Sequence, residues 1–320
     1  MRSLTVDGAG KDGPAGGSGG SHGSGEPGQT WPPDAPPTRL LPVGSTPLAA
    51  YDVTAGRPPT GSTPARSTPG LRPVLLVPGY TGSKEDFVPL VHLVAAAGHR
   101  VLAYDQRGQY RSPGPADPSA YSVSALGADL LALVDHLGLA PVHLVGHSFG
   151  GLVARAAVLE RPGAFTSLTL LGSGPAALPE GPRLQMMRML EPVLAEGGLP
   201  GVWEAMQAAD VRPRVLPVTP AMQEFLRTRF LTSSAVGLVA MGDALRAEQD
   251  RVEELAATGL PVLVAYGEDD DAWPPALQLE MAERLDADVV EVPGAMHSPA
   301  QEAPEATARG LLDFWESVEG

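Results

Sequence analysis

The sequence predicts an α/β protein built on a doubly wound, mostly parallel sheet, with a helical segment inserted into it. Short apolar runs such as 74–77, 101–104 and 142–145 alternate with longer stretches of helical periodicity. Runs that are apolar throughout are typical of strands buried on both faces of a parallel sheet. The alternation stops between residues 175 and 247, where helical patterns follow one another without a convincing strand, and it resumes at residue 261.

The elements of the first half follow from these patterns and from the turn residues that end them. We expect a pair of strands about a Gly-Ser-Thr-Pro turn, then four strands of the main sheet and three helices between them. Pro78-Gly79 ends the first buried strand, and Gly98 and Gly138 end the first two helices. The expected strands are 40–43, 48–53, 74–77, 101–104, 142–145 and 168–171, and the expected helices are 84–97, 123–137 and 151–160.

The second half begins with helices alone. The inserted segment carries helical patterns at 183–196, 202–209, 221–231 and 235–247. After it come a strand at 261–266, a helix at 275–285, a strand at 289–292 and a closing helix at 303–318. We therefore expect a sheet domain formed by residues 38–174 and 248–320, with residues 175–247 as a helical cap.

Composition excludes several classes of protein. A chain of 320 residues that is 43% hydrophobic can fill the core of one large domain with an insertion. Its net charge of −15 would repel nucleic acid and anionic membranes, so neither is an expected partner. Because cysteine is absent, disulfides, thiolate nucleophiles and Cys-based metal sites are excluded. Oxygen and imidazole chemistry remain, and we expect no metal and no organic cofactor.

The amino-terminal region has the composition of a tail. Residues 1–37 are mostly Gly, Ser, Pro and Asp, with Trp31 as the one aromatic residue, so we expect them to be disordered. They lack the continuous apolar stretch of a secretory signal, and no apolar run approaches the ~20 residues of a membrane span. A cytoplasmic location is the expectation, and the oligomeric state stays open.

Ser148 is the candidate nucleophile. It lies at the centre of Gly146-His147-Ser148-Phe149-Gly150, between an apolar strand and a helix-forming stretch. This pattern is typical of a nucleophile elbow, a strained strand-to-helix turn whose flanking glycines remove steric conflict. A serine hydroxyl needs a base to take its proton. His297, in a turn after the last expected strand, is placed at the carboxyl edge of the sheet where the elbow also emerges.

The base needs a carboxylate that fixes its tautomer. The loop after strand 261–266 offers Glu268, Asp269, Asp270 and Asp271, and the residues alone leave the choice open. A run of four acids is usually a solvated surface feature, so we expect most of these four carboxylates to be exposed to solvent.

Together these motifs resemble the α/β-hydrolase superfamily from about residue 40 to 318, in which the triad follows the order Ser, acid, His. In that family the acid usually stands three residues after the glycine that ends the strand, with a proline four residues further on. Gly267, Asp270 and Pro274 match, so the resemblance selects Asp270, with Asp269 as the alternative. Family members that hydrolyse haloalkanes or epoxides normally carry aspartate at the elbow, which argues against both activities here.

The resemblance also implies an oxyanion hole. The family's His-Gly segment corresponds to Pro78-Gly79, with proline in place of the usual histidine. The implied donors are the backbone N–H groups of Tyr80 and Phe149, and the missing histidine leaves the geometry of the loop open. Asp105-Gln106-Arg107-Gly108 and the four residues after it resemble a structural turn of the family, with Tyr110 where glycine is usual.

The substrate pocket is expected between the cap and the elbow. Met186, Met187 and Leu190 are candidate lining residues because flexible thioethers suit varied apolar groups, although core packing explains them equally well.

The resemblance implies a serine hydrolase, with a carboxylesterase acting on a small apolar ester as the leading hypothesis. Alternatives are carbon–carbon bond hydrolysis, amide or prolyl-peptide cleavage, lactone opening, acyl transfer and perhydrolysis, or a non-catalytic ligand receptor.

Overall fold

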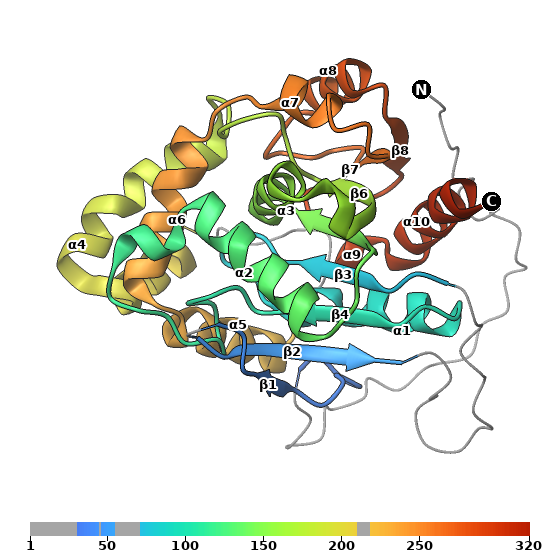
Figure 1. The fold of residues 1–320 in the computed structure, drawn as a ribbon. Helices are drawn as coiled ribbons and strands as arrows, with labels where there is room; N and C mark the ends of the chain where they lie inside the picture. The colour runs from blue at the N-terminus through green and yellow to red at the C-terminus, as the bar shows by residue number, and fades with distance from the viewer. Residues whose placement is uncertain (1–30, 45, 55–70, 210–217) are drawn as a thin grey trace, which may run out of the picture.

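The computed structural model describes residues 31–44, 46–54, 71–209 and 218–320. Its eight strands form one sheet in the order β1-β2-β4-β3-β5-β6-β7-β8 (Figure 1). Pairing is antiparallel from β1 to β2 and from β2 to β4, and parallel between all other neighbours. The predicted doubly wound, mostly parallel sheet is therefore confirmed. The strands are β1 Arg39–Leu41, β2 Leu48–Val53, β3 Val74–Val77, β4 Val101–Tyr104, β5 Val142–His147, β6 Phe165–Leu171, β7 Val262–Gly267 and β8 Asp288–Val292.

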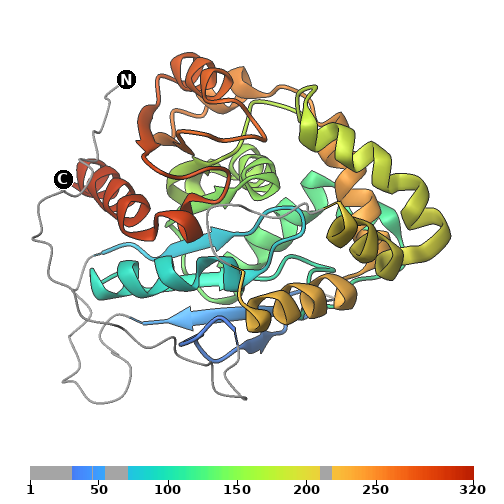
Figure 2. The ribbon, with the colours of Figure 1, turned by 180° about the vertical axis from the view of Figure 1, so that it is seen from behind.

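Helices cover both faces of the sheet, which explains why central strands such as β3 and β4 are apolar throughout. In β3, Leu75 and Val77 belong to the core shared with α2, α3 and α8, whereas Val74 and Leu76 belong to the core shared with α1 and α10. Figure 2 shows α1 and α10 in front of the sheet. These helices are α1 Val88–Ala96, α2 Val123–His136, α3 Phe149–Glu160, α8 Pro275–Leu285 and α10 Pro304–Glu319.

Between β6 and β7 the described residues form only helices. These are α4 Pro182–Ala208, α5 Pro220–Thr232, α6 Ala235–Ala247 and α7 Val252–Ala256. Figure 1 shows α4 and α6 beyond the end of the sheet toward which β3 points. Gly198 has a φ of 59°, which interrupts α4 between the two helices expected there. α7 was not predicted, because five residues are too short to show a helical period.

The two ends of this helical segment meet at one buried arginine. Arg155 of α3 is 2% exposed. Its guanidinium donates to the carbonyl oxygens of Pro175 and Gln249 and forms an ion pair with Glu248. The backbone N–H of Ala177 also donates to the carbonyl of Glu248. Arg155 thus joins the residues at which the chain leaves the sheet domain to those at which it returns.

The start of the described chain differs from the expected tail. Residues 31–34 lie on the body: the Trp31 ring packs 4.9 Å from the Phe225 ring of α5, and His92 of α1 bonds the Asp34 carbonyl oxygen. Pro32 is buried. The prediction of disorder up to residue 37 is therefore wrong for this stretch, because one large ring finds an aromatic partner that composition does not reveal. Residues 1–30 lie outside the described residues.

Candidate active site

Ser148 lies at a sharp turn between β5 and α3. Its φ of 55° and ψ of −124° fall in a region that residues with a side chain rarely adopt. The strained backbone is held from both sides: the Ser148 N–H donates to the Leu171 carbonyl, and the Ser148 carbonyl accepts from Gly151 N–H. The predicted strand-to-helix turn is present at this serine.

Glycine is required around the turn because three backbone segments meet there. A Cβ on Gly146 would lie 2.4 Å from the Gly150 carbonyl oxygen, and one on Gly150 would lie 2.4 Å from that of Val77. Both distances are shorter than any real Cβ contact. The close approach brings the loop after β3 against Ser148, since a Cβ on Gly79 would be 3.1 Å from Ser148 Cβ.

The structure brings Ser148, His297 and Asp270 into one hydrogen-bonded chain. His297 Nε2 lies 3.0 Å from Ser148 Oγ, and His297 Nδ1 lies 3.0 Å from Asp270 Oδ1. All three residues are buried. Because a carboxylate only accepts hydrogen bonds, Nδ1 carries the proton and Nε2 is free to take one from the serine. The arrangement can activate a serine hydroxyl for attack on an electrophilic carbon.

Asp270 is the acid that reaches His297, and its neighbours point elsewhere. Glu268 and Asp269 are exposed, and Asp271 forms an exposed ion pair with Arg183 at 2.6 Å. Gln278 of α8 fixes the other carboxylate oxygen of Asp270, with Nε2 to Oδ2 at 3.0 Å. Of the two alternatives from the sequence, the geometry thus selects Asp270 over Asp269.

The environment of Asp270 keeps it ionised. Burial raises the pKa of this carboxyl, but the hydrogen bond and charge of His297 and the N–H groups of Ala272 and Gln278 outweigh burial and hold the pKa below its usual value. An ionised Asp270 can stabilise the positive charge that His297 acquires when its ring takes up a proton.

Two residues that sequence reasoning missed hold the loop of His297. His147 Nε2 donates to the His297 carbonyl at 2.8 Å, and Glu302 Oε2 accepts from the N–H groups of Met296 and Ser298. The rings of His147 and His297 are 5.1 Å apart. Burial, together with the nearby His297, lowers the pKa of His147 to about 4, so it acts as a neutral donor.

Tyr80 and Phe149, the expected oxyanion donors, flank the serine. Phe149 opens α3, where a backbone N–H has no partner within the helix. Tyr80 follows Gly79 in the loop against Ser148, and its hydroxyl donates to the Leu238 carbonyl of α6 at 2.7 Å. The loop beside Ser148 is therefore bonded directly to the helical segment.

The candidate pocket residues lie on α4 with different surroundings. Met187 is half-buried. A Cβ on Gly242 of α6 would lie 3.5 Å from Met187 Cε and 2.8 Å from the Tyr80 hydroxyl oxygen, so both side chains approach this glycine. Leu190 packs on a small apolar cluster of the helical segment that Tyr80 also joins. Met186 is half-buried. Two of the three residues therefore lie near the neighbours of Tyr80.

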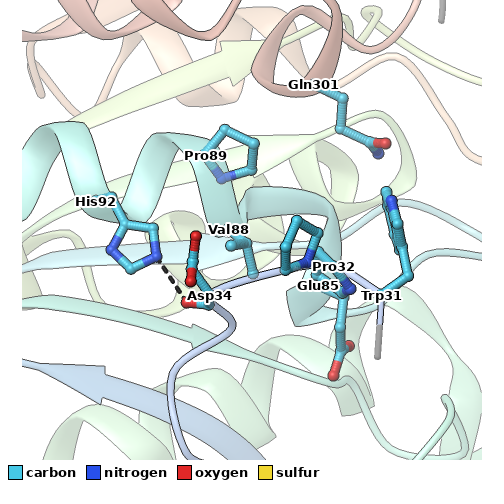
Figure 3. A pocket seen from close by; sticks show the side chains of 9 residues that line it. Trp31, Pro32, Asp34, Glu85, Val88, Pro89, His92 and Gln301 are labelled. Atoms are coloured by element: carbon cyan, nitrogen blue, oxygen red, sulfur yellow. Dashed lines mark hydrogen bonds between the residues drawn. The ribbon is translucent and has the colours of Figure 1, made fainter. Parts of the chain in front are cut away.

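A separate cavity of about 330 Å³ lies beside the amino-terminal stretch (Figure 3). Trp31, Pro32, Pro89 and Gln301 are among its lining residues, and none of the three residues of the hydrogen-bonded chain lines it. Figure 3 also shows the hydrogen bond from His92 to Asp34.

Within the described ranges, no cluster of three or more His, Asp or Glu side chains could hold a metal ion. No helix in those ranges is long and apolar enough to cross a membrane.

The fold and this serine–histidine–aspartate arrangement define a class of hydrolases. A family model described as the alpha/beta hydrolase family matches residues 74–310. The chain belongs to this family.

Its relatives carry names from several kinds of acyl chemistry. A 3-oxoadipate enol-lactonase of Acinetobacter baylyi is 29% identical over 206 residues, which cover 64% of this chain and 74% of that protein. A candidate carbamate hydrolase of Variovorax paradoxus is 39% identical over 100 residues, which cover 31% of this chain and 37% of that protein. Among solved structures, one from a study of carboxylesterases of Nitrososphaera gargenis is 25% identical, with a TM-score of 0.69 over 88% of this chain and 98% of that chain.

Proposed function

We propose that this hydrolase cleaves a carboxylic ester through an acyl-enzyme formed on Ser148. The observation that carries the proposal is the unbroken hydrogen-bonded chain from Ser148 Oγ through His297 to the ionised Asp270, set on a strained turn. The names of the relatives support it, because an enol-lactone, a carbamate and an ester each present an acyl carbonyl to a nucleophile.

The reaction follows from the geometry in two halves. His297 Nε2 takes the Ser148 proton as Oγ attacks the carbonyl carbon, and Asp270 stabilises the imidazolium. The N–H groups of Tyr80 and Phe149 bind the oxyanion, each contributing about 3 kcal/mol to lowering the barrier. His297 then protonates the leaving alkoxide as the C–O bond breaks. Water, deprotonated by His297, attacks the acyl-enzyme in the same way and releases the acid and Ser148.

We assign residues 175–247 to a cap over this site, with Met187 and Leu190 facing the acyl or alcohol group. The hydrogen bond from Tyr80 to Leu238 supports this placement, as does the burial of Ser148 and His297, at 6% and 7% exposure. An apolar lining of this kind suits an uncharged substrate.

Turnover of p-nitrophenyl esters of increasing acyl length tests the proposal. We expect hydrolysis with an initial burst that reports the acyl-enzyme, and loss of both in Ser148→Ala. The same panel should hold a lactone and a carbamate, whose faster turnover would assign the enzyme to those substrates instead. Binding of the esters without turnover in the unaltered protein would contradict the proposal and favour a receptor.

A further inference from the structure

Two buried glutamines of the turn after β4 bind the loop that carries the Tyr80 N–H. Gln109 Nε2 donates to the carbonyl oxygens of Gly79 and Tyr80, at 2.7 and 3.0 Å, and Gln106 Nε2 donates to that of Pro78 at 2.8 Å. Both glutamines are 1% exposed. Three successive carbonyls of the loop therefore accept hydrogen bonds from side chains of one neighbouring turn, and the Gly79 carbonyl also accepts the Gly82 N–H at 3.2 Å.

The orientation of the Gln109 amide is fixed by the hydrogen bond that its oxygen accepts. Gln109 Oε1 accepts the backbone N–H of Gln106 at 3.1 Å. Since the oxygen is engaged by a donor, Nε2 must face the carbonyls, and the reversed amide would leave oxygen against oxygen. The Gln109 side chain is thus held at both ends.

A hydrogen bond at the Gly79 carbonyl acts on the Tyr80 N–H because both groups belong to one peptide unit. The unit is planar and trans, so its C=O and N–H point in opposite directions. A donor that fixes the carbonyl therefore fixes the direction of the N–H. Gly79 approaches Ser148 closely, so a small rotation of this unit changes where its N–H points relative to the reacting carbonyl.

We propose that Gln109 is a positioning residue of the oxyanion hole: its amide holds the Gly79–Tyr80 peptide unit so that the Tyr80 N–H meets the developing oxyanion. The proposal rests on the acyl-transfer function given above. Pro78 stands where the family usually has histidine, and in this chain the loop is held by the two glutamines.

The first test replaces Gln109 by methionine, which has a similar volume and no donor. We expect kcat to fall by about 10- to 100-fold with KM changed by less than about 3-fold, because the lost interaction acts in the transition state. Gln109→Glu is the second variant: it retains an acceptor for the Gln106 N–H and places a carboxylate oxygen where the donor was. It should likewise lower kcat with little change in KM. The matched control is Ser112→Ala, in the same turn.

Ser112 suits this purpose because its hydroxyl bonds the Asp105 carbonyl and the Ala49 N–H and touches no carbonyl of the loop. Ser112→Ala should lower the melting temperature with kcat nearly unchanged. A trifluoromethyl ketone, which forms an oxyanion on the serine, should lose affinity for both Gln109 variants by the same factor as kcat/KM. Unchanged kcat, or equal losses in Ser112→Ala, would overturn the proposal.

A fluorophosphonate separates this proposal from the choice of substrate. Its reaction with Ser148 needs the base and the oxyanion donors but no carboxylic ester. If the unaltered protein is labelled yet hydrolyses no ester, the proposed function fails while the Gln109 test continues on the labelling rate. Slower labelling of Gln109→Met than of Ser112→Ala supports the positioning role, and equal rates refute it.

Discussion

Asp270 differs from its acidic neighbours in what surrounds its carboxylate. It accepts hydrogen bonds from His297, Ala272 and Gln278 in a buried site, whereas Asp269 is exposed. A side chain that is bonded on all sides cannot be replaced by its solvated neighbour one residue away. The acid run therefore divides into one residue for the site and others for the surface.

This division predicts the effect of neutralising each acid. Asp270→Asn should reduce kcat by about 10⁴-fold, because an amide no longer selects the tautomer of His297 or stabilises its charge. Asp269→Asn should change kcat by less than about 2-fold, since its carboxylate is solvated. Steady-state kinetics on one ester compares the two. An inactive Asp269→Asn beside an active Asp270→Asn would transfer the role to Asp269.

Because the pKa of His147 is lowered in the folded protein, we expect the free energy of unfolding to depend on pH. Its pKa is about 4 in the folded protein and about 6.5 when unfolded, so below pH 6.5 the unfolded state binds a proton that the folded state does not. Stability is then lost as the pH falls from about 6.5 to 4, and the loss reaches about 2 kcal/mol at pH 5. His147→Gln, whose amide can still donate to the His297 carbonyl, should lose less stability over this range.

Urea unfolding at pH 8 and pH 5 measures the difference. The exposed His136 of α2 provides the control, and His136→Gln should follow the unaltered protein. Equal losses in His147→Gln and the unaltered protein would show that His147 is not held neutral.

The site could be predicted from sequence as far as it depends on local turns. The elbow glycines, the turn of His297 and the spacing of Asp270 are local patterns, and the structure brings their three residues together. Gln109 and His147 were not found, because each bonds to a distant segment whose proximity depends on the tertiary fold. Gln278 and Glu302 bond to residues near them in sequence, but a glutamine or glutamate at these positions forms no recognisable motif. A spacing rule says nothing about such contacts.

At the scale of elements, the amino-terminal stretch makes more contacts with the rest of the molecule than its composition suggests. Trp31 contacts Phe225, whose ring also meets Tyr110 edge-on and the Arg229 guanidinium. Arg229 in turn forms an ion pair with Asp86 in the turn that follows the Tyr80 loop. The stretch therefore joins a group of contacts that connects α5 to the sheet domain.

Two truncations test this contribution. Removal of residues 1–30 should leave the melting temperature nearly unchanged, as their composition suggests. Removal of residues 1–37 should lower stability by about 1 to 2 kcal/mol, the loss expected for a half-buried aromatic contact. Thermal unfolding of both proteins gives the comparison. Equal melting temperatures would mean that Trp31 contributes nothing to stability.

The elements themselves were predictable where hydrophobic period and turn residues agree. β4 has the expected bounds, and α2 and α8 end within one residue of expectation, since Gly138 and the buried apolar positions define them. α10, Pro304–Glu319, lies within one residue of the closing helix expected at 303–318, whereas the short helix α9, Pro299–Glu302, was not predicted. Short helices and docked loops depend on contacts that periodicity does not record.

At the scale of the whole molecule, we expect replacement of Arg155 to lower the free energy of unfolding substantially. Arg155→Met leaves the buried carbonyls of Pro175 and Gln249 without a donor and Glu248 without its partner, so stability should fall by about 3 kcal/mol. Arg188→Met, on the exposed surface of α4, should have little effect. Urea unfolding of both variants checks the difference, and a loss in Arg155→Met no greater than in Arg188→Met would contradict it.

The meeting of both ends of the helical segment at Arg155 also bears on how such a chain can diversify. A segment that leaves and returns at one point can lengthen, shorten or be exchanged without shifting the strands on either side, and the entropy cost grows only with the logarithm of its length. Selection can then act on the helical segment separately from the sheet. The same junction gives the natural boundaries for grafting a foreign helical segment onto this sheet.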